Sequence, residues 1–368
     1  MGKDYSSGME IPLGQRLREL PGPLLLTGHT GFKGTWMTFL LEHLNIPVVG
    51  YSLPAEKGSL FDRGKRTGAI PEAFSDIRNY EALEQFIDLH KPSTIIHMAA
   101  QPLVLKSYEN PRETFDINVM GTVNVLDIAF KKDYLQAVEI VTTDKVYKND
   151  DSGHAFIETD ALQGKDPYSA SKVGTEAVVS AWQQIGRVFG GPRVLSVRSG
   201  NVIGGGDFAE NRIIPDLIRG VMTGKTVEIR NPQSIRPWQH VLDPLVGYLQ
   251  SLEYVLEDEI NSSINFGPST ERLTVSEICA LSVVFWRERG NELKIQEILQ
   301  EEKEVESRIL ELNSAFANKT LNWKIVWNSS RALVETLDWW NQVINFGRAP
   351  SELVKSDIQK YLIELRSC

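Results

Sequence analysis

The strongest constraint on this chain is a short apolar run that breaks into three evenly spaced glycines. Residues 24–26 are typical of a buried strand, and apolar residues recur at helical spacing over residues 37–44. Gly28, Gly31 and Gly34 lie between these two segments. The stretch therefore predicts a strand, a tight turn and a helix N-terminus, where free N–H groups and the helix dipole favour an anion such as a pyrophosphate.

The glycine spacing alone does not establish a dinucleotide site. It is G-x-x-G-x-x-G, whereas the common dinucleotide fingerprint is G-x-G-x-x-G. A generic loop with chance glycines is the alternative, and the rest of the chain has to decide between the two.

The remaining sequence alternates between apolar runs and amphipathic stretches. Further strands are predicted at residues 48–51, 94–100, 139–142 and 194–197, and helices at 80–89, 118–130 and 168–182. This alternation predicts an α/β fold with a Rossmann-like doubly wound parallel sheet. We expect a dinucleotide-binding domain over 20–200 with a returning segment near 236–260, a smaller substrate-binding domain over 201–368, and a surface arm over 1–19.

Composition limits the kinds of partner that the chain is expected to bind and indicates the compartment in which it is expected. The net charge of −9 on 368 residues, with acids spread along the chain, argues against nucleic acid or an anionic membrane as the partner. Cys279 and Cys368 lack metal-ligand spacing, so neither a disulfide framework nor a metal site is expected. The chain shows no leader-like start and no apolar run of membrane length, so a cytoplasmic location is expected.

Polar residues follow the predicted strands, where ligands of open α/β sheets gather. Thr143, Asp144 and Lys145 come directly after one of these strands. Tyr168 and Lys172 open a later helix and, being four residues apart, share one of its faces. A cation beside a phenol lowers the phenol pKa from about 10, as a tyrosine base requires. A lone Y-x-x-x-K is usually a surface pair, which is the alternative.

Together these motifs resemble the extended short-chain dehydrogenase/reductase superfamily. The resemblance is carried by residues 27–34, Thr143 and Tyr168-x-x-x-Lys172. Within the superfamily the chain is most similar to the CDP-glucose 4,6-dehydratases, through residues 99–104, 118–122, 144–145, 200–207 and 236–242. Asn265-Phe266-Gly267-Pro268 and Trp339-Trp340 also fit, so the likeness runs from about residue 24 to about residue 340.

The resemblance implies a lyase of deoxysugar biosynthesis that uses NAD on a nucleotide sugar, CDP-glucose first of all. In such enzymes the sugar is oxidised at C4, water is lost across C5 and C6, and hydride returns to C6. Thr143, Tyr168 and Lys172 would be catalytic, with Asp144 as the acid and Lys145 as the base or its electrostatic helper. A strand-end ion pair between Asp144 and Lys145 is the alternative. The family also implies a homodimer or higher homo-oligomer.

The resemblance also implies two sets of binding residues. The cofactor set is Gly28, Thr30, Gly31, Phe32, Lys33, Asp76, Ile77, Ala99, Ala100, Gln101, Asn118, Tyr168 and Lys172. The set for the sugar and its pyrophosphate is Gln101, Ser107, Asn201, Arg212 and Arg236.

Some of these residues have structural alternatives. Asp76 could instead be a helix N-cap. Asn118 could pack beneath the active-site helix rather than orient it. His29 could touch a cofactor phosphate or cap the turn, and His240 is expected to be a buried core residue.

Two departures from the family pattern leave ligand identity open. Residues 51–53 supply no acid for a ribose hydroxyl, so NAD over NADP rests on the resemblance alone. Lys106 stands near a position where an arginine is expected, so a dehydratase for another nucleotide sugar remains an alternative.

Two other classes of function compete with a dehydratase. A nucleotide-sugar epimerase would have no use for an acid at C6, so Asp144 and Lys145 speak against it. A non-catalytic dinucleotide sensor would not need Thr143, Tyr168 and Lys172.

Overall fold

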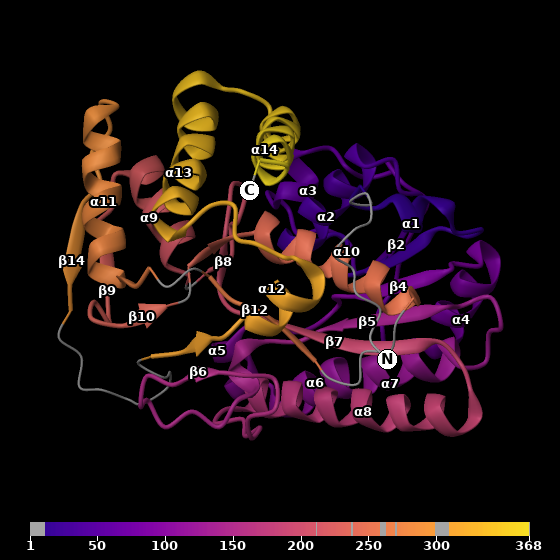
Figure 1. Ribbon diagram of the computed structural model, residues 1–368. Helices are drawn as coiled ribbons and strands as arrows, with labels where there is room; N and C mark the ends of the chain where they lie inside the picture. The colour runs from indigo at the N-terminus through magenta and orange to yellow at the C-terminus, as the bar shows by residue number, and fades with distance from the viewer. Residues whose placement is uncertain are drawn as a thin grey trace.

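A seven-stranded parallel sheet organises the part of the chain that the structure describes (Figure 1). The structure is a computed structural model that describes residues 12–210, 212–236, 238–257, 263–268, 271–298 and 309–367. The strand order is β12-β7-β5-β4-β1-β2-β3, and every pairing in the sheet is parallel. From β1 the chain moves outward to β2 and β3, then returns to β4 on the other side of β1. The order therefore reverses between β1 and β4, where open α/β sheets bind ligands.

The strands are short and mostly buried. They are β1 Leu24–Thr27, β2 Val48–Ser52, β3 Glu72–Phe74, β4 Thr94–His97, β5 Ala137–Val141, β7 Arg193–Ser199 and β12 Ile264–Phe266. All residues of β1, β2, β4, β5 and β12 are buried, because helices cover both faces of the sheet.

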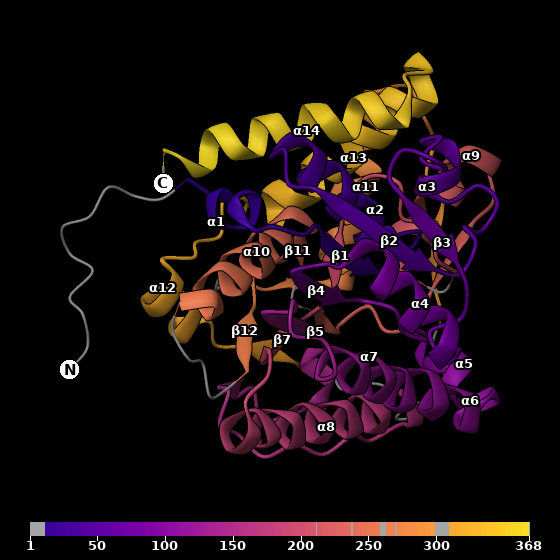
Figure 2. The same cartoon turned by 90° about the vertical axis from the view of Figure 1, so that its right-hand side faces the viewer.

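Helices form one layer on each face of the sheet (Figure 2). One layer holds α4 Tyr80–His90, α7 Gly121–Ala129 and α8 Pro167–Phe189. The other holds α2 Phe32–His43 and α10 Leu242–Glu257, with α13 Ser329–Phe346 and α14 Pro350–Leu365 beyond them. The fold is the predicted Rossmann-like doubly wound sheet.

The remaining elements are mostly short. The helices are α1 Gln15–Glu19, α3 Leu60–Arg63, α5 Val104–Glu109, α6 Pro111–Phe115, η1 Asp116–Met120, η2 Asp144–Val146, α9 Ile213–Thr223, α11 Val275–Glu288 and α12 Ala315–Leu321. The strands are β6 Ala155–Phe156, β8 Val202–Ile203, β9 Val227–Ile229, β10 Ile235–Arg236, β11 Gln239–His240, β13 Leu273–Thr274, β14 Ile295–Glu297 and β15 Glu311–Leu312. These strands form two-stranded pairs outside the main sheet.

The sequence missed both edge strands of the main sheet. β3 and β12 are each only three residues long and each contains a polar residue, so neither carries a clear apolar run. The predicted helix over residues 118–130 is divided between a π-helical turn, η1, and α7. Residues 1–11 of the predicted arm lie outside the described residues, and residues 15–19 are helical, with Leu17 buried.

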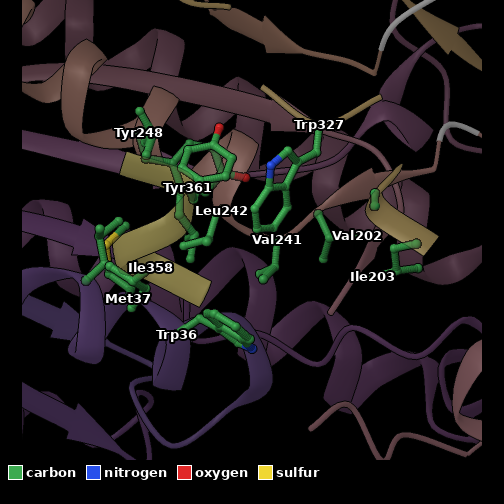
Figure 3. Close-up of a cluster of buried hydrophobic side chains, with 14 of the residues drawn as sticks. Trp36, Met37, Val202, Ile203, Val241, Leu242, Tyr248, Trp327, Ile358 and Tyr361 are labelled. Atoms are coloured by element: carbon green, nitrogen blue, oxygen red, sulfur yellow. The ribbon is translucent and has the colours of Figure 1, made fainter. Parts of the chain in front are cut away.

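A large apolar cluster attaches the C-terminal helices to the sheet (Figure 3). It brings together Trp36 and Met37 of α2, Leu242 of α10, Trp327 and Tyr361. The indole N–H of Trp36 also donates to the carbonyl of Gly205 at 3.0 Å. The helix that follows the glycine-rich turn is thus held against the segment that follows β7. α10 contacts β5, β7 and β12. The domain boundary near residue 200 remains a prediction.

No helix among the described residues is long and apolar enough to cross a membrane.

Candidate active site

The glycine-rich turn lies at the carboxyl end of β1, beside the point where the strand order reverses. Gly28 has φ of +75°, and a Cβ there would lie 2.7 Å from the backbone nitrogen of Ala99. A Cβ on Gly34 would lie 2.1 Å from the carbonyl oxygen of Gly28. Only glycine at both positions lets the end of β4 and the first turn of α2 approach the loop this closely.

The N-terminus of α2 is open to an anion. Gly31 is its N-cap residue, no side chain caps the helix, and no acidic residue lies in its first turn. A Cβ on Gly31 would contact only the carbonyl oxygen of Gly28, at 3.4 Å. The first N–H groups of the helix and its dipole can therefore receive a phosphate.

Two neighbouring side chains in the turn are engaged within the protein. The Thr30 hydroxyl hydrogen-bonds that of Ser52 at 2.8 Å and donates to the carbonyl of Leu53 at 2.9 Å. His29 is buried and pairs with Glu72 at 2.8 Å between Nε2 and Oε2. The expectation that the His29 side chain touches a phosphate or caps the turn is therefore wrong, because it joins α2's loop to β3.

Thr143, Asp144 and Lys145 directly follow β5. Thr143 is extended and caps the short helix η2, accepting from the Lys145 N–H at 3.3 Å. Its hydroxyl donates to Oδ1 of Asp144 at 3.0 Å. Thr143 and Asp144 are buried, and Lys145 is half-buried at the start of η2.

Tyr168 and Lys172 lie on the first turns of α8. Asp166 caps this helix through a capping box with Ser169, and Pro167 opens it. The Tyr168 phenol is hydrogen-bonded to Thr143, and the charge of Asp144 acts to raise the pKa of this phenol. The tyrosine of α8 and the polar residues after β5 are therefore brought together.

Burial dominates the acid–base properties of this cluster. It raises the pKa of Tyr168 to about 12, against the hydrogen bond from Thr143. The expected lowering of this pKa by Lys172 is wrong here, because burial outweighs neighbouring charge; the Lys172 Nζ donates to the carbonyl of Val141 at 3.1 Å. Burial also lowers the pKa of Lys172 to about 8, opposed by the charge of Glu176.

Asp144 has an environment that favours its protonated form. Burial raises its pKa, although the charges of Lys145, Arg236 and Lys33 and the Thr143 hydrogen bond oppose this. Burial thus shifts this carboxyl toward its protonated form, the form in which it can act as an acid.

Lys33 is half-buried in the same site. Its Nζ donates to the Ser199 hydroxyl at 2.7 Å and to the Tyr248 hydroxyl at 3.1 Å. Burial lowers its pKa to about 7, and the charge of Arg212 acts in the same direction while that of Asp144 opposes it. The charges of Lys145, Arg236 and Lys33 all act on Asp144, which suits the binding of an anionic ligand nearby.

Three residues of the C-terminal half are predicted to bind the sugar nucleotide. They differ in burial and in their contacts. Arg212 is the N-cap residue of α9, and its Nη1 lies 3.2 Å from Oδ2 of Asp207. Arg236 is half-buried on β10, and its charge reaches Asp144. Asn201 is exposed between β7 and β8.

Gln101 and Asn118 form a hydrogen-bonded group next to α8. Gln101 donates through Nε2 to the Thr114 hydroxyl at 3.0 Å, and its backbone N–H donates to the Asn118 side chain at 2.8 Å. Asn118 also donates through Nδ2 to the Ser171 hydroxyl at 2.8 Å, between Tyr168 and Lys172 along the helix. These contacts orient the helix, and the ligand-binding roles of both residues remain predictions.

Ser107 is also engaged at α8. Its hydroxyl is fully buried and accepts from the backbone N–H of Tyr168 at 3.1 Å. The hydroxyl donates in turn to the carbonyl of Val104 at 2.6 Å. Ser107 therefore holds the tyrosine-bearing turn, and its contact with substrate remains a prediction.

The predicted adenine-contacting pair follows β3. Asp76 forms an ion pair with Arg78 at 2.7 Å, and Ile77 is buried. The alternative of Asp76 as a helix N-cap is wrong, because Asn79 caps α4 by accepting from the Ala82 N–H. Ala99 and Ala100 lie half-buried just past the end of β4.

This arrangement of motifs on a parallel sheet has counterparts among known proteins. Residues 24–267 match the model of a family described as "NAD dependent epimerase/dehydratase family". The chain belongs to the NAD dependent epimerase/dehydratase family.

Individual relatives of this epimerase/dehydratase agree with the match. The chain is 38% identical over 327 residues to a CDP-glucose 4,6-dehydratase of Salmonella typhimurium, covering 86% of this chain and 89% of that one. Solved structures of similar fold include dTDP-glucose 4,6-dehydratase from Bacillus anthracis in complex with NAD, with a TM-score of 0.72, 21% identity and coverage of 87% and 97%. UDP-glucose 4-epimerase from Thermus thermophilus in complex with NAD has a TM-score of 0.73, 22% identity and coverage of 87% and 99%.

The residues of this epimerase/dehydratase fit NAD. The uncapped N-terminus of α2 and the room at Gly31 match a dinucleotide diphosphate. The acid that often binds a ribose hydroxyl is missing after β2, where Ser52 bonds Thr30 instead. Among the residues described, no group of three or more His, Cys, Asp or Glu side chains could hold a metal ion.

The sequence missed several residues that shape the site of this epimerase/dehydratase. His97 is buried at the end of β4, bonds the Thr27 hydroxyl at 2.7 Å, and burial lowers its pKa to about 3. Glu176 on α8 was also missed, although it follows Lys172 by the same four residues that separate Tyr168 from Lys172. That repeated spacing could have revealed it.

Proposed function

We propose that this epimerase/dehydratase is a nucleotide-sugar 4,6-dehydratase that converts CDP-glucose to CDP-4-keto-6-deoxyglucose. The observation that carries the proposal is the buried Asp144 beside the hydrogen-bonded pair of Thr143 and Tyr168. The loss of water requires a proton donor next to the tyrosine, whereas an epimerase has no use for one. The sequence identity to a CDP-glucose 4,6-dehydratase supports the choice of substrate.

Tyr168 acts at the sugar 4-hydroxyl in this proposal. Its phenolate accepts the hydroxyl proton, and the Thr143 hydroxyl stabilises the phenolate when it donates to Tyr168 instead of to Asp144. In the free protein burial holds the Tyr168 pKa near 12, so the phenol becomes a base only when positive charge enters the site. NAD, when bound, would supply the redox chemistry, with the hydride lost from C4 returned at C6, so no other oxidant would be consumed.

Asp144 and Lys145 act at C5 and C6 of the sugar in this proposal. A ketone at C4 makes the C5 proton acidic, and Lys145 at the start of η2 takes that proton or stabilises the resulting enolate. Asp144 donates its proton to the departing C6 oxygen. Burial prepares Asp144 for this role by raising its pKa.

Arginine side chains bind the pyrophosphate. Arg212 begins α9 and Arg236 lies on β10, and the charges of both reach the Tyr168–Asp144 cluster. A guanidinium binds phosphate oxygens in a bidentate way, which suits both residues to this task. We also propose a cytoplasmic location, where a soluble nucleotide sugar and NAD meet.

The proposal is tested by incubating the purified protein and NAD with a panel of CDP-, UDP-, dTDP- and GDP-glucose. We expect a 4-keto-6-deoxy sugar from CDP-glucose, seen by mass as loss of one water and by the keto-sugar chromophore in alkali. Conversion to a 4-epimer without loss of water would establish an epimerase instead. Turnover of only a uridine or thymidine sugar would refute the cytidine assignment.

We propose a homodimer that forms through the helices next to α8. Exposed apolar side chains come from α5, α6 and η1, all of which contact α8: Leu105, Tyr108, Phe115 and Met120. Light scattering of the wild type should give twice the chain mass of 41.4 kDa. Met120→Glu should halve this mass because it places a charge in the apolar contact.

The control for this variant is Leu89→Glu, at an exposed apolar residue of α4 away from α8. It should remain dimeric. A wild-type mass equal to one chain would contradict the dimer.

A further inference from the structure

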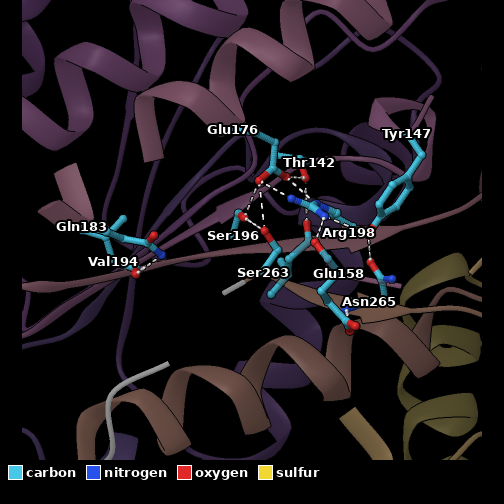
Figure 4. Close-up of polar contacts among 11 residues, drawn as sticks. Thr142, Tyr147, Glu158, Glu176, Gln183, Val194, Ser196, Arg198, Ser263 and Asn265 are labelled. Carbon is cyan, nitrogen blue, oxygen red and sulfur yellow. Dashed lines mark hydrogen bonds and ion pairs between the residues drawn. The ribbon is translucent and has the colours of Figure 1, made fainter. Parts of the chain in front are cut away.

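A buried ion pair links α8 to β7 of the main sheet (Figure 4). Glu176 of α8 and Arg198 of β7 are 2.8 Å apart, and their side chains are 5% and 4% exposed. The reaction derived above uses neither residue. A buried ion pair adds little stability compared with apolar residues of similar size. Stability alone therefore does not explain its presence.

Glu176 accepts hydrogen bonds from residues of β7 and from residues next to the ends of β5 and β12. Its Oε1 accepts from the Thr142 hydroxyl at 2.6 Å and from Nε of Arg198 at 2.9 Å. Its Oε2 accepts from Nη2 of Arg198 at 2.8 Å and from the hydroxyls of Ser196 and Ser263 at 2.8 and 3.1 Å. Although burial opposes it, Arg198 holds the pKa of Glu176 below its ordinary value, so the pair is ionised.

Arg198 extends the network to the segment that follows η2. Its Nη1 donates to the Tyr147 hydroxyl at 2.7 Å and to the carbonyl of Glu158 at 3.1 Å. The Tyr147 hydroxyl donates in turn to Oδ1 of Asn265 in β12, at 2.8 Å. The guanidinium also lies over the Tyr147 ring, 5.0 Å from its centroid.

These contacts hold both sides of the segment that carries Asp144. Thr142 lies immediately before residues 143–145 and is bonded to Glu176, and Tyr147 lies two residues after them and is bonded to Arg198. Glu176 itself lies one turn beyond Lys172 on the same face of α8. One ion pair is thus bonded to both of the segments that have to meet at the sugar.

We propose that Glu176 and Arg198 are positioning residues, whose ion pair sets the place of Asp144 and Lys145 relative to Tyr168 and Lys172. The inference rests on the proposed function. Guanidinium and carboxylate are planar and bidentate, so they fix direction as well as distance, which apolar contacts do not. A displacement of about 1 Å at reacting groups can cost about 100-fold in rate, so such a device has a measurable effect.

The test removes single hydroxyl groups at the edge of the network and keeps the ion pair. Thr142→Val removes the bond to Glu176, and Tyr147→Phe removes the bond to Arg198. We expect each to lower kcat at least about tenfold while KM changes less than about twofold, because the binding groups stay in place. Thr142→Ser keeps the hydroxyl and should keep kcat within about threefold of the wild type.

Two matched controls remove comparable buried bonds elsewhere. Ser251→Ala deletes a hydroxyl that donates to the buried Glu139 at 2.6 Å on the opposite face of β5. Tyr361→Phe deletes a hydroxyl that donates to the buried Asp243 at 2.6 Å. Both controls should lower the melting temperature and leave kcat unchanged. Equal losses of kcat in controls and test variants would overturn the proposal.

Amide hydrogen exchange provides a readout that does not need turnover. Residues 143–147 should exchange faster in Thr142→Val and Tyr147→Phe than in the wild type and in both controls. Unchanged exchange there, or a wild-type kcat in these variants, would overturn the proposal. If the wild type converts no nucleotide sugar, the proposed function fails, while the exchange data still decide whether the pair positions this segment.

Discussion

Tyr168→Phe should lower dehydration of CDP-glucose by at least about 1,000-fold, because no other group takes the proton from the 4-hydroxyl. The substitution removes one oxygen and leaves the ring between α8 and η2. Its hydroxyl bonds Thr143, so we expect only a small change in melting temperature. Turnover is measured by the keto-sugar product, and NAD binding by calorimetry.

The two measurements separate a chemical role from a structural one. We expect NAD to bind Tyr168→Phe with close to wild-type affinity. Turnover near the wild-type rate would remove Tyr168 from the mechanism. Tyr361→Phe serves as the control, because it deletes another buried phenol hydroxyl from a helix remote from η2.

Asp144→Asn should lower kcat by about 100- to 1,000-fold at a different step. Asparagine keeps the shape of the side chain and its oxygen for the Thr143 hydroxyl, but it has no proton to give to the C6 oxygen. Oxidation at C4 depends on Tyr168 and should proceed. We therefore expect the near-ultraviolet absorbance of reduced NAD to rise when CDP-glucose is added, and to persist. Unchanged kcat with no such absorbance would exclude Asp144 as the acid.

The pH profile gives a second reading of the same variant. Burial raises the pKa of Asp144, and the acid is active only in its protonated form. In the wild type, kcat should therefore fall as the pH rises through this pKa. Asp144→Asn has no group to titrate there, so this decrease should be absent from its residual activity. A profile of the same shape in both proteins would assign the titration to another group.

The central sheet was predictable because its interior strands carry their signal locally. The strands at residues 24–27 and 94–97 are fully buried and contain the apolar runs 24–26 and 95–96, so hydropathy alone reveals them. The edge strands β3 and β12 are short, and β12 pairs with β7 across more than sixty residues of intervening chain. Pairing of this kind depends on the packed fold and leaves no local pattern.

The components of the site were also visible in the sequence, but their electrostatics were not. The spacing of Tyr168 and Lys172 on one helix face followed from helix geometry. The direction of the Tyr168 pKa did not, because burial outweighs neighbouring charge and Lys172 bonds the Val141 carbonyl. Burial is set by every element around the site, so it cannot be read from a motif.

By itself the sequence determined the chemical identity of the groups at the ends of β1, β4 and β5, because glycine turns, strand ends and helix faces are local features. Only the tertiary structure decided which of these groups meet and in what environment. His29 pairs with Glu72, Lys33 lies in the site, and the ion pair of Glu176 and Arg198 joins α8 to the sheet. Each of these contacts joins residues distant in the chain, and their energies depend on desolvation that arises only when the layers pack.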